Sequence, residues 1–340
     1  MTFDLKTSEV VASVVEKSAR KVMLQLPDGL KRYGLEVAET VEKETGATVY
    51  LSADPCYGAC DLPTEEAKRL GVDLIVHYGH TPFTKQITSN IIYVPVKAKV
   101  ELSEVVEKAL HLLAGYSNIG LITTLQHVGD LKLVEAMLRK CGKEVRIGQP
   151  GDHAEYPGQV TGCDYTAAKT IEQSVDAYLY IGGGIFHALG VALAVKQPVI
   201  IADPYLGEVR DLTALRQKVI NQRKAAIRRL VQARIVGVIV GTKTGQFNCD
   251  NAEVIRKELT THGKKVTLLT MREITPEAID NFPDIDVFIN TACPRVGVDD
   301  PERYTRPIIS YAEVLEAFKS GWTVTRCSQS GKSLNSSSQE

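Results

Sequence analysis

Apolar runs alternate along the chain with amphipathic segments, in an order that repeats three times. Each copy opens with an apolar run that is typical of a buried parallel strand. These runs are residues 21–26, 118–123 and 234–240. An amphipathic helix follows each run and stops at a glycine, the residue favoured in the left-handed conformation that ends many helices. These glycines are Gly46, Gly142 and Gly263. The recurrence predicts three related segments in one chain.

Three further predicted strands complete each copy. The second strands are residues 47–52, 143–148 and 264–269, and the third strands are 72–79, 175–183 and 285–293. The fourth strands are residues 90–96, 197–204 and 306–312. A helix is predicted before the third strand in the first two copies. Strands that alternate with helices of this length predict right-handed crossovers and parallel sheets. We therefore expect an α/β fold of three related domains, each a small four-stranded parallel sheet flanked by helices, arranged with pseudo-threefold symmetry around a central site.

The predicted boundaries follow from this repeat. They divide the chain into residues 1–108, 109–215 and 216–327, followed by a polar tail at 328–340 whose Ser-rich composition is typical of disorder. A helix at residues 215–232 is expected to bridge into the third domain. Residues 1–20 predict an amphipathic helix that lacks the apolar core of a secretory signal.

Composition narrows the class of protein. Lys+Arg 40 against Asp+Glu 41 gives no excess positive charge, so direct nucleic-acid binding is not expected. No run reaches the roughly 18 uncharged apolar residues of a membrane span, so we expect no membrane contact and a cytoplasmic location. In that reducing compartment, seven cysteines indicate metal ligands or reactive thiols rather than a disulfide framework.

One cysteine of each copy lies at the carboxyl side of a strand, where ligands collect in parallel sheets. These residues are Cys60, Cys163 and Cys293. A single loop cysteine more often packs than binds, but the joint pattern favours a shared site. Thiolates select zinc, copper(I) or iron-sulfur clusters, and structural zinc normally takes four ligands, often from C-x2-C pairs that are not evident here. The three residues therefore predict an iron-sulfur cluster with one open iron.

The other cysteines are weaker candidates. Cys56 forms C-x3-C with Cys60, but Pro63 stands at the third position of the usual radical S-adenosylmethionine signature, C-x3-C-x2-C. The remaining three are not expected to be ligands: Cys141, Cys249 and Cys327.

Four motifs and the three-copy layout carry a resemblance to a known family. The motifs are QLPDGL at 25–30, YGACD at 57–61, GQVTGC at 158–163 and NTACPR at 290–295. Over nearly its whole length the chain resembles the archaeal diphthamide-synthesis enzymes, the 2-(3-amino-3-carboxypropyl)histidine synthases, which are non-standard radical S-adenosylmethionine enzymes. The family's cluster cysteines fall on the three residues named above, and Cys56 is not a ligand in that pattern.

The resemblance implies an activity and partners. It implies a [4Fe-4S] cluster whose open iron meets S-adenosylmethionine, with an external electron donor. Reductive cleavage would give a 3-amino-3-carboxypropyl group, which is joined to the imidazole C2 of a histidine in elongation factor 2 as the first step toward diphthamide. It also implies a homodimer.

Residues near other strand ends are candidates for contact with the cofactor or substrate, and a plain turn or packing role is the alternative for each. The glycine-rich turn at 182–184 does not match the dinucleotide-binding motif G-x-G-x-x-G, because His187 stands at the position of the third glycine. Lys243 and Gln246 lie in a loop that is not a Walker motif and are candidates to hold the methionine carboxylate. His80 and Arg295 are candidates to hydrogen-bond substrate or cluster sulfurs. The predicted contact residues are Tyr57, Gly58, His80, Gly183, Gly184, His187, Asp203, Gln246 and Arg295.

Two alternative functions, and the role of one basic surface, are not decided by the sequence. The alternatives are a quinolinate-synthase-like [4Fe-4S] dehydratase and a non-catalytic cluster-carrying subunit that delivers electrons. A basic cluster is expected to be chiefly a solvated helix face, with docking of the elongation factor as the minority interpretation. Its residues are Arg223, Lys224, Arg228, Arg229 and Arg234.

Overall fold

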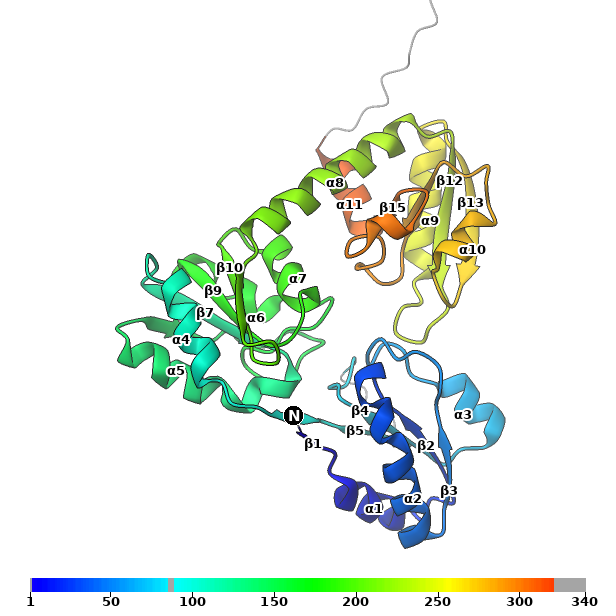
Figure 1. The fold of residues 1–340 in the computed structure, drawn as a ribbon. Coiled ribbons are helices and arrows are strands. Elements are labelled where there is room, and N and C mark those ends of the chain that lie inside the picture. Colours follow the sequence, from blue (N-terminus) through cyan, green and yellow to red (C-terminus); the bar gives the residue numbers. More distant parts are fainter. Residues whose placement is uncertain (1, 85–88, 321–340) are drawn as a thin grey trace, which may run out of the picture.

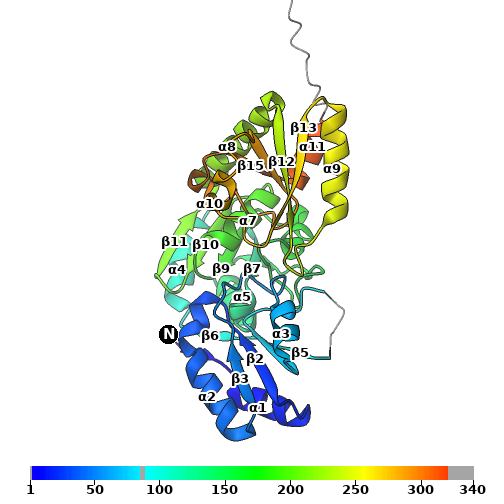
Figure 2. The same ribbon diagram turned by 90° about the vertical axis from the view of Figure 1, so that its right-hand side faces the viewer.

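The computed structural model describes residues 2–84 and 89–320, so Cys327 and the predicted tail at 328–340 lie outside the described residues. The chain forms three lobes at the corners of a triangle (Figure 1). Seen after a quarter turn, the first lobe lies at the bottom and the third at the top (Figure 2). Each lobe contains one of the three predicted copies.

The first lobe contains a four-stranded parallel sheet in the order β3-β2-β4-β5. Its elements are β2 (Lys21–Gln25), α2 (Gly34–Thr45), β3 (Thr48–Leu51), α3 (Thr64–Leu70), β4 (Leu74–Tyr78) and β5 (Ile91–Val94). Helix α1 (Thr7–Glu16) and α2 cover one face, where Val10, Val37 and Val41 pack against the strands. All five residues of β4 are buried, as expected for a central strand covered on both faces.

The second lobe repeats this order and adds one strand, giving β8-β7-β9-β10-β11. Its elements are α4 (Ser103–Leu112), β7 (Asn118–Thr123), α5 (Leu131–Lys140), β8 (Glu144–Arg146), α6 (Thr166–Lys169), β9 (Ala177–Ile181), α7 (Phe186–Ala194), β10 (Val199–Asp203) and β11 (Glu208–Asp211). The four predicted strands are parallel, and the additional edge strand β11 pairs antiparallel with β10. It was not predicted because EVRD has little apolar content.

The third lobe has the order β13-β12-β14-β15, again parallel throughout. Its elements are β12 (Ile235–Gly241), α9 (Cys249–Thr261), β13 (Lys265–Met271), α10 (Pro276–Asp280), β14 (Val287–Asn290), β15 (Ile308–Ser310) and α11 (Tyr311–Lys319). The short helix α10 precedes the third strand of this copy, where none was expected. Thr275 caps it by accepting from the Ala278 amide.

The helix-ending glycines are confirmed. Gly46, Gly142 and Gly263 have φ of 71°, 78° and 75°, the left-handed conformation that a side chain would disfavour. Each lets the chain turn directly into the second strand of its copy. In each lobe the first strand in sequence is flanked by the second and the third. The carboxyl ends of the parallel strands therefore share one edge per sheet.

The amino terminus differs from the predicted helix over residues 1–20. Strand β1 (Thr2–Asp4) pairs antiparallel with β6 (Lys97–Lys99), and α1 begins only after Lys6, which adopts a left-handed φ of 49°. The pairing partner lies more than ninety positions away, so local periodicity could not indicate it. Among the described residues, no helix is both long and apolar enough to cross a membrane.

Both predicted domain boundaries fall within helices. The one at 108/109 lies inside α4, whose Val105, Val106 and Ala109 pack into the core of the second lobe. The one at 215/216 lies inside α8 (Thr213–Gln232), the predicted bridging helix, which runs from the second lobe to the third (Figure 1). We therefore propose that the first boundary lies just before α4 and that α8 itself forms the second.

Candidate functional site

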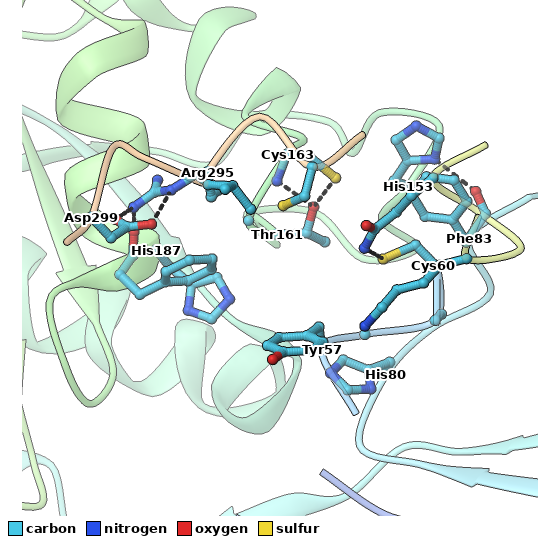
Figure 3. A pocket seen from close by; sticks show the side chains of 18 of the residues that line it. Tyr57, Cys60, His80, Phe83, His153, Thr161, Cys163, His187, Arg295 and Asp299 are labelled. Carbon is cyan, nitrogen blue, oxygen red and sulfur yellow. Dashed lines mark hydrogen bonds and ion pairs between the residues drawn. The ribbon is translucent and has the colours of Figure 1, made fainter. Parts of the chain in front are cut away.

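A cavity of about 550 Å³ is lined by residues of all three lobes. Cys60, Cys163 and Cys293 all line it, and Figure 3 shows the side chains of Cys60 and Cys163 among the residues around it. Cys60 lies in the loop after β3, Cys163 in the segment between β8 and α6, and Cys293 just beyond β14. Three residues that are far apart in the sequence are thus brought to one cavity.

The third lobe packs directly on Cys60. The Gln246 amide donates to the Cys60 thiol sulfur at 3.3 Å, and the Gly245 N–H donates to the Cys60 carbonyl at 2.8 Å. A Cβ on Gly245 would lie 2.6 Å from the Cys60 Cα, closer than real Cβ atoms approach. Only glycine permits this contact, which couples the position of Cys60 to a loop of the third lobe.

The other two cysteines are supported within their own lobes. The Thr161 hydroxyl lies 3.7 Å from the Cys163 sulfur and also accepts from the Asp164 N–H at 3.0 Å, which holds the turn. The Asn290 side-chain amide donates to the Cys293 carbonyl, and its oxygen accepts from the Ala292 N–H at 2.8 Å. Both thiols are therefore held in hydrogen-bonded turns at strand ends.

Without a bound metal, the surroundings of these three cysteines favour the protonated thiol over the thiolate. Burial raises the pKa of Cys60 and of Cys293, and it raises the pKa of Cys163 to about 11. The two neighbouring cysteines contribute to the rise at Cys163, since thiolates close together repel. A bound cation reverses this preference, because coordination deprotonates a thiol. The site is therefore suited to thiolate ligands only when it holds a positively charged centre.

A second group of possible metal ligands lies near the three cysteines, in the first lobe. Over residues 2–84 and 89–320, ligand atoms of Cys56, His77 and His80 all lie within 4.8 Å of one another. The three cavity cysteines are not in that group, and a multi-iron cluster, which is wider than one ion, does not require its thiolates to lie so close together.

Six of the nine predicted contact residues line the cavity: Tyr57, Gly58, His80, His187, Gln246 and Arg295. The other three, Gly183, Gly184 and Asp203, are not among its lining residues. The Asp203 carboxylate instead accepts from the N–H groups of Gly184 at 3.0 Å and Tyr205 at 2.9 Å. A Cβ on Gly183 would lie 2.5 Å from the Tyr205 ring. The residues of this turn contact one another, which agrees with the alternative of a plain turn.

Lys243 forms ion pairs that the sequence did not predict. Its ammonium pairs with the carboxylates of Asp61 and Glu273 at 2.7 Å each, and it lies 4.0 Å from the centre of the Tyr57 ring. Both Lys243 and Asp61 are 3% exposed. Burial lowers the pKa of Lys243, but the two carboxylates outweigh burial and the net shift is upward. Lys243 therefore stays charged and ties the third lobe to the first. It also lines the cavity, so its contact with a substrate carboxylate stays a prediction.

Arg295 also connects lobes. Its guanidinium donates to the Tyr165 hydroxyl at 3.0 Å, to the Phe186 carbonyl at 2.7 Å and to the Asp299 carboxylate (Figure 3). It lies 4.3 Å from the centre of the Phe186 ring and is 6% exposed. These contacts occupy most of its donors, so it holds the second lobe against the third beside Cys293.

One further pair at the cavity wall could not be predicted from the sequence. The rings of Phe83 and His153 stack at 4.0 Å with an interplanar angle of 2°, and the His153 Nδ1 donates to the Phe83 carbonyl at 2.6 Å (Figure 3). The two residues belong to different lobes and lie 70 positions apart. Only the tertiary arrangement brings them together.

Comparison with known proteins gives concordant results. The family model described as "Putative diphthamide synthesis protein" matches residues 26–327. The chain is 33% identical to 2-(3-amino-3-carboxypropyl)histidine synthase of Pyrococcus horikoshii, over 92% of this chain and 90% of that protein. It is 31% identical to subunit 1 of the same synthase from Schizosaccharomyces pombe, over 89% of this chain and 70% of that protein.

Solved structures show the same fold. The crystal structure of Dph2 from Pyrococcus horikoshii has a TM-score of 0.84 and 32% identity, covering 92% of this chain and 89% of that one. A second structure of that protein, with a 4Fe-4S cluster, has a TM-score of 0.84 at 32% identity and covers 93% of this chain and 91% of that one. The expected resemblance is confirmed, and the chain belongs to the diphthamide synthesis family.

Proposed function

We propose that this chain transfers the 3-amino-3-carboxypropyl group of S-adenosylmethionine to the imidazole C2 of a histidine in elongation factor 2. One observation carries the proposal: three cysteines, one from each lobe, line a single cavity. The related Dph2 structure with a 4Fe-4S cluster supports a cluster as their common ligand. The names of the relatives support the transferred group and the histidine acceptor.

The residues at the site fit a [4Fe-4S] cluster held by Cys60, Cys163 and Cys293. Three thiolates leave one iron without a protein ligand, and a bound cluster there would supply the electron that cleaves S-adenosylmethionine reductively. The Gln246 amide, 3.3 Å from the Cys60 sulfur, would donate a hydrogen bond to a ligating thiolate. Such donors tune the reduction potential of a cluster.

The cavity has room for a substrate beside the cysteines. Its volume of about 550 Å³ is within the range of pockets for ligands the size of S-adenosylmethionine. Of the predicted contacts, we retain Tyr57, Gly58, His187 and Gln246, which line the cavity. A buried ion pair between Lys243 and Asp61 joins two of the lobes beside this space, and we expect the surrounding lobes to limit access of water to a reactive fragment.

The partners of the proposed reaction are elongation factor 2 as protein substrate and an external electron donor. We further propose a homodimer and a cytoplasmic location. The family match favours this function over the quinolinate-synthase-like alternative, since the matching model spans residues 26–327. An electron-delivery subunit would share the cysteines but would not transfer the group.

The test is a product assay under anaerobic conditions. Reconstituted protein is reduced with dithionite and incubated with S-adenosylmethionine, with and without elongation factor 2. We expect methylthioadenosine and a mass gain on one histidine of the factor. A protein that holds the cluster but forms no methylthioadenosine would support the electron-delivery alternative, and quinolinate formed from small-molecule precursors would support the dehydratase.

A further inference from the structure

A chain of hydrogen bonds runs from the Cys60 loop to His80 at the cavity wall. The Gln25 Nε2 lies 2.6 Å from the Asp61 backbone carbonyl oxygen, and the Gln25 Oε1 lies 2.7 Å from the His77 Nδ1. The His77 Nε2 contacts the His80 Nδ1 at 2.9 Å. Gln25 and His77 are paired across adjacent strands β2 and β4, at 3% and 0% exposure. The proposed function leaves this buried polar chain without a role.

The donor and the acceptor of each hydrogen bond in this chain follow from the Asp61 backbone carbonyl. A backbone carbonyl only accepts, so the Gln25 atom that contacts Asp61 must be its NH2 group, and its Oε1 must accept from the Nδ1–H of His77. A neutral imidazole carries one N–H, so the His77 Nε2 is an acceptor and the His80 Nδ1 must donate to it. The Nε2 of His80 is therefore left unprotonated.

Both imidazoles are held neutral. Burial lowers the pKa of His77 well below its ordinary value, and His80 adds to the effect. Burial likewise lowers the pKa of His80 to about 4, against the opposing effect of a hydrogen bond with the Tyr78 backbone. His80 is also partly accessible from the cavity that it lines. The His80 ring contacts the His77 Nε2 through its Nδ1. Its Nε2 is therefore the nitrogen that remains to accept a hydrogen bond from a group in the cavity.

The surroundings of His80 select a neutral donor. A cationic ammonium, such as that of the methionine moiety, is stabilised by a neighbouring carboxylate. Among the described residues, no carboxylate contributes to the pKa shift of His80. The nearby His187 is itself neutral, since burial lowers its pKa to about 3, with Arg295 and His80 contributing. A neutral N–H of an incoming side chain fits this environment better than a positive charge.

We propose that the Nε2 of His80 accepts a hydrogen bond from the ring N–H of the target histidine and so positions its C2 for the transfer. This inference rests on the proposed function. In imidazole, C2 is bonded to both ring nitrogens, so holding one nitrogen places C2 one bond from the contact. The relay through His77 and Gln25 keeps His80 in the accepting tautomer. His80 binds the acceptor, and His77 and Gln25 are positioning residues.

The first test observes the tautomer without any reaction. Nitrogen-15 NMR of histidine-labelled, cluster-free protein near pH 7 should show an unprotonated Nε2 and a protonated Nδ1 for His80, assigned with the His80→Phe variant. Gln25→Leu removes the anchor and should shift the His80 signals toward a mixture of tautomers. A protonated Nε2 on His80 in the unsubstituted protein would overturn the proposal.

The second test separates acceptor binding from cleavage of S-adenosylmethionine. His80→Phe keeps a ring but removes the acceptor, and it should lower kcat/KM for elongation factor 2 by about tenfold, the effect of one hydrogen bond of ordinary strength. Formation of methylthioadenosine without the factor is measured in parallel, and transfer to the factor should fall more than this cleavage does. His80→Gln, which retains an acceptor oxygen, should recover part of the loss. His111→Phe, at an exposed histidine of α4, is the matched control.

The outcomes distinguish failure of this inference from failure of the proposed function. Unchanged transfer by His80→Phe, or equal loss of methylthioadenosine formation, would overturn the role of His80 while the proposed function stands. Absence of methylthioadenosine from the unsubstituted enzyme would overturn the proposed function itself. One equivalent of zinc bound in addition to the cluster, and lost in Cys56→Ala, would show that Cys56, His77 and His80 hold a metal and would overturn the relay.

Discussion

At the scale of single residues, the site depends on contacts that the three cysteines make with other parts of the chain. The Cys60 sulfur accepts from the Gln246 amide of another lobe, and the Cys163 sulfur lies beside the Thr161 hydroxyl. The Cys293 carbonyl is held by Asn290. Each lobe supplies one thiol, so loss of any one cysteine removes one of the three proposed cluster ligands.

Replacing one ligand should abolish cluster binding. Cys60→Ala, Cys163→Ala and Cys293→Ala should each hold little iron after anaerobic reconstitution, against about four irons per chain for an intact [4Fe-4S] cluster. Cys141→Ala, at an exposed cysteine, should keep the full iron content. Iron analysis and the visible absorption of the cluster measure the effect. Full iron in any of the first three variants would contradict the ligand assignment.

A methyl group at Gly245 should disturb Cys60 from the opposite side of an interface. Gly245→Ala places a Cβ 2.6 Å from the Cys60 Cα and 3.0 Å from its carbonyl oxygen, so backbone must move. We expect a loss of about 1–3 kcal/mol in the free energy of unfolding and lower iron occupancy. Gly115→Ala is the control, because no atom lies within 4 Å of its Cβ position. Equal stability of the two variants in urea would contradict the expectation.

At the scale of elements, α8 is fixed to the third lobe by a partly buried network. The Arg223 guanidinium pairs with Glu313 of α11 at 2.6 Å and donates to the carbonyls of Gly297 at 2.6 Å and Ile308 at 2.7 Å. Glu313 also closes the capping box of α11 with Ser310. Arg223 was expected to be part of a solvated basic face, and the structure corrects this. Its partners lie 74 to 90 positions away, beyond any helical spacing.

The Glu313 carboxylate should stabilise this lobe in a pH-dependent way. Burial raises the pKa of Glu313, but the hydrogen bonds and charge of Arg223 outweigh burial, and the net shift is below its ordinary value of 4.5. A lowered pKa in the folded state gives stability that is present above pH 4.5 and lost as pH falls through the lower, folded value.

Glu313→Gln should therefore unfold more easily at pH 7, by about 1.5–3 kcal/mol, because a charged hydrogen-bonded partner of Arg223 is lost. The difference from the unsubstituted protein should shrink as pH falls below 4.5. Glu44→Gln, at an exposed position of α2, is the control. Chemical denaturation at several pH values measures the effect, and a difference that does not depend on pH would contradict it.

The parts of the fold and site that local patterns encode could be predicted, and those that depend on tertiary contact could not. The strand repeats and their closing glycines are local, and they led to the three cavity cysteines. The partners of Lys243 and Arg295 are set by how the lobes meet, so these side chains could be suspected near the site but not assigned. Asp203 follows a strand as a ligand would, yet its carboxylate holds its own turn.

At the scale of the whole molecule, each pair of lobes is joined beside the cavity. Lys243 and Asp61 join the third lobe to the first, and Arg295 and the Phe186 carbonyl join the third to the second. The Gln159 amide donates to the Thr81 hydroxyl at 3.1 Å between the second lobe and the first. Three polar junctions therefore hold the lobes together around the cavity.

Removing the buried cation at one junction should be costly. Lys243→Met leaves the Asp61 carboxylate, 3% exposed, without its 2.7 Å partner, and we expect a loss of about 3–5 kcal/mol in stability. Arg272→Met is the matched control, because its pair with Glu66 joins the same lobes but is 43% and 34% exposed. That variant should lose less than about 1 kcal/mol.

The double variant Lys243→Met/Asp61→Leu tests the cause. It should recover part of the loss, because no buried charge is then left unpaired. Thermal unfolding of the unsubstituted protein, the single variants Lys243→Met and Asp61→Leu, and the double variant measures the comparison. A double variant as unstable as the sum of both single changes would show that the pair is not the source of the effect.

The distribution of the cavity cysteines over three lobes bears on how the protein matures. Cys293 follows β14, so a nascent chain lacks one corner of the proposed cluster until most of its length has been synthesised. A chain that ends before Cys293 would offer at most two of the three thiols. Insertion of the proposed cluster is therefore expected only after the third lobe has been made.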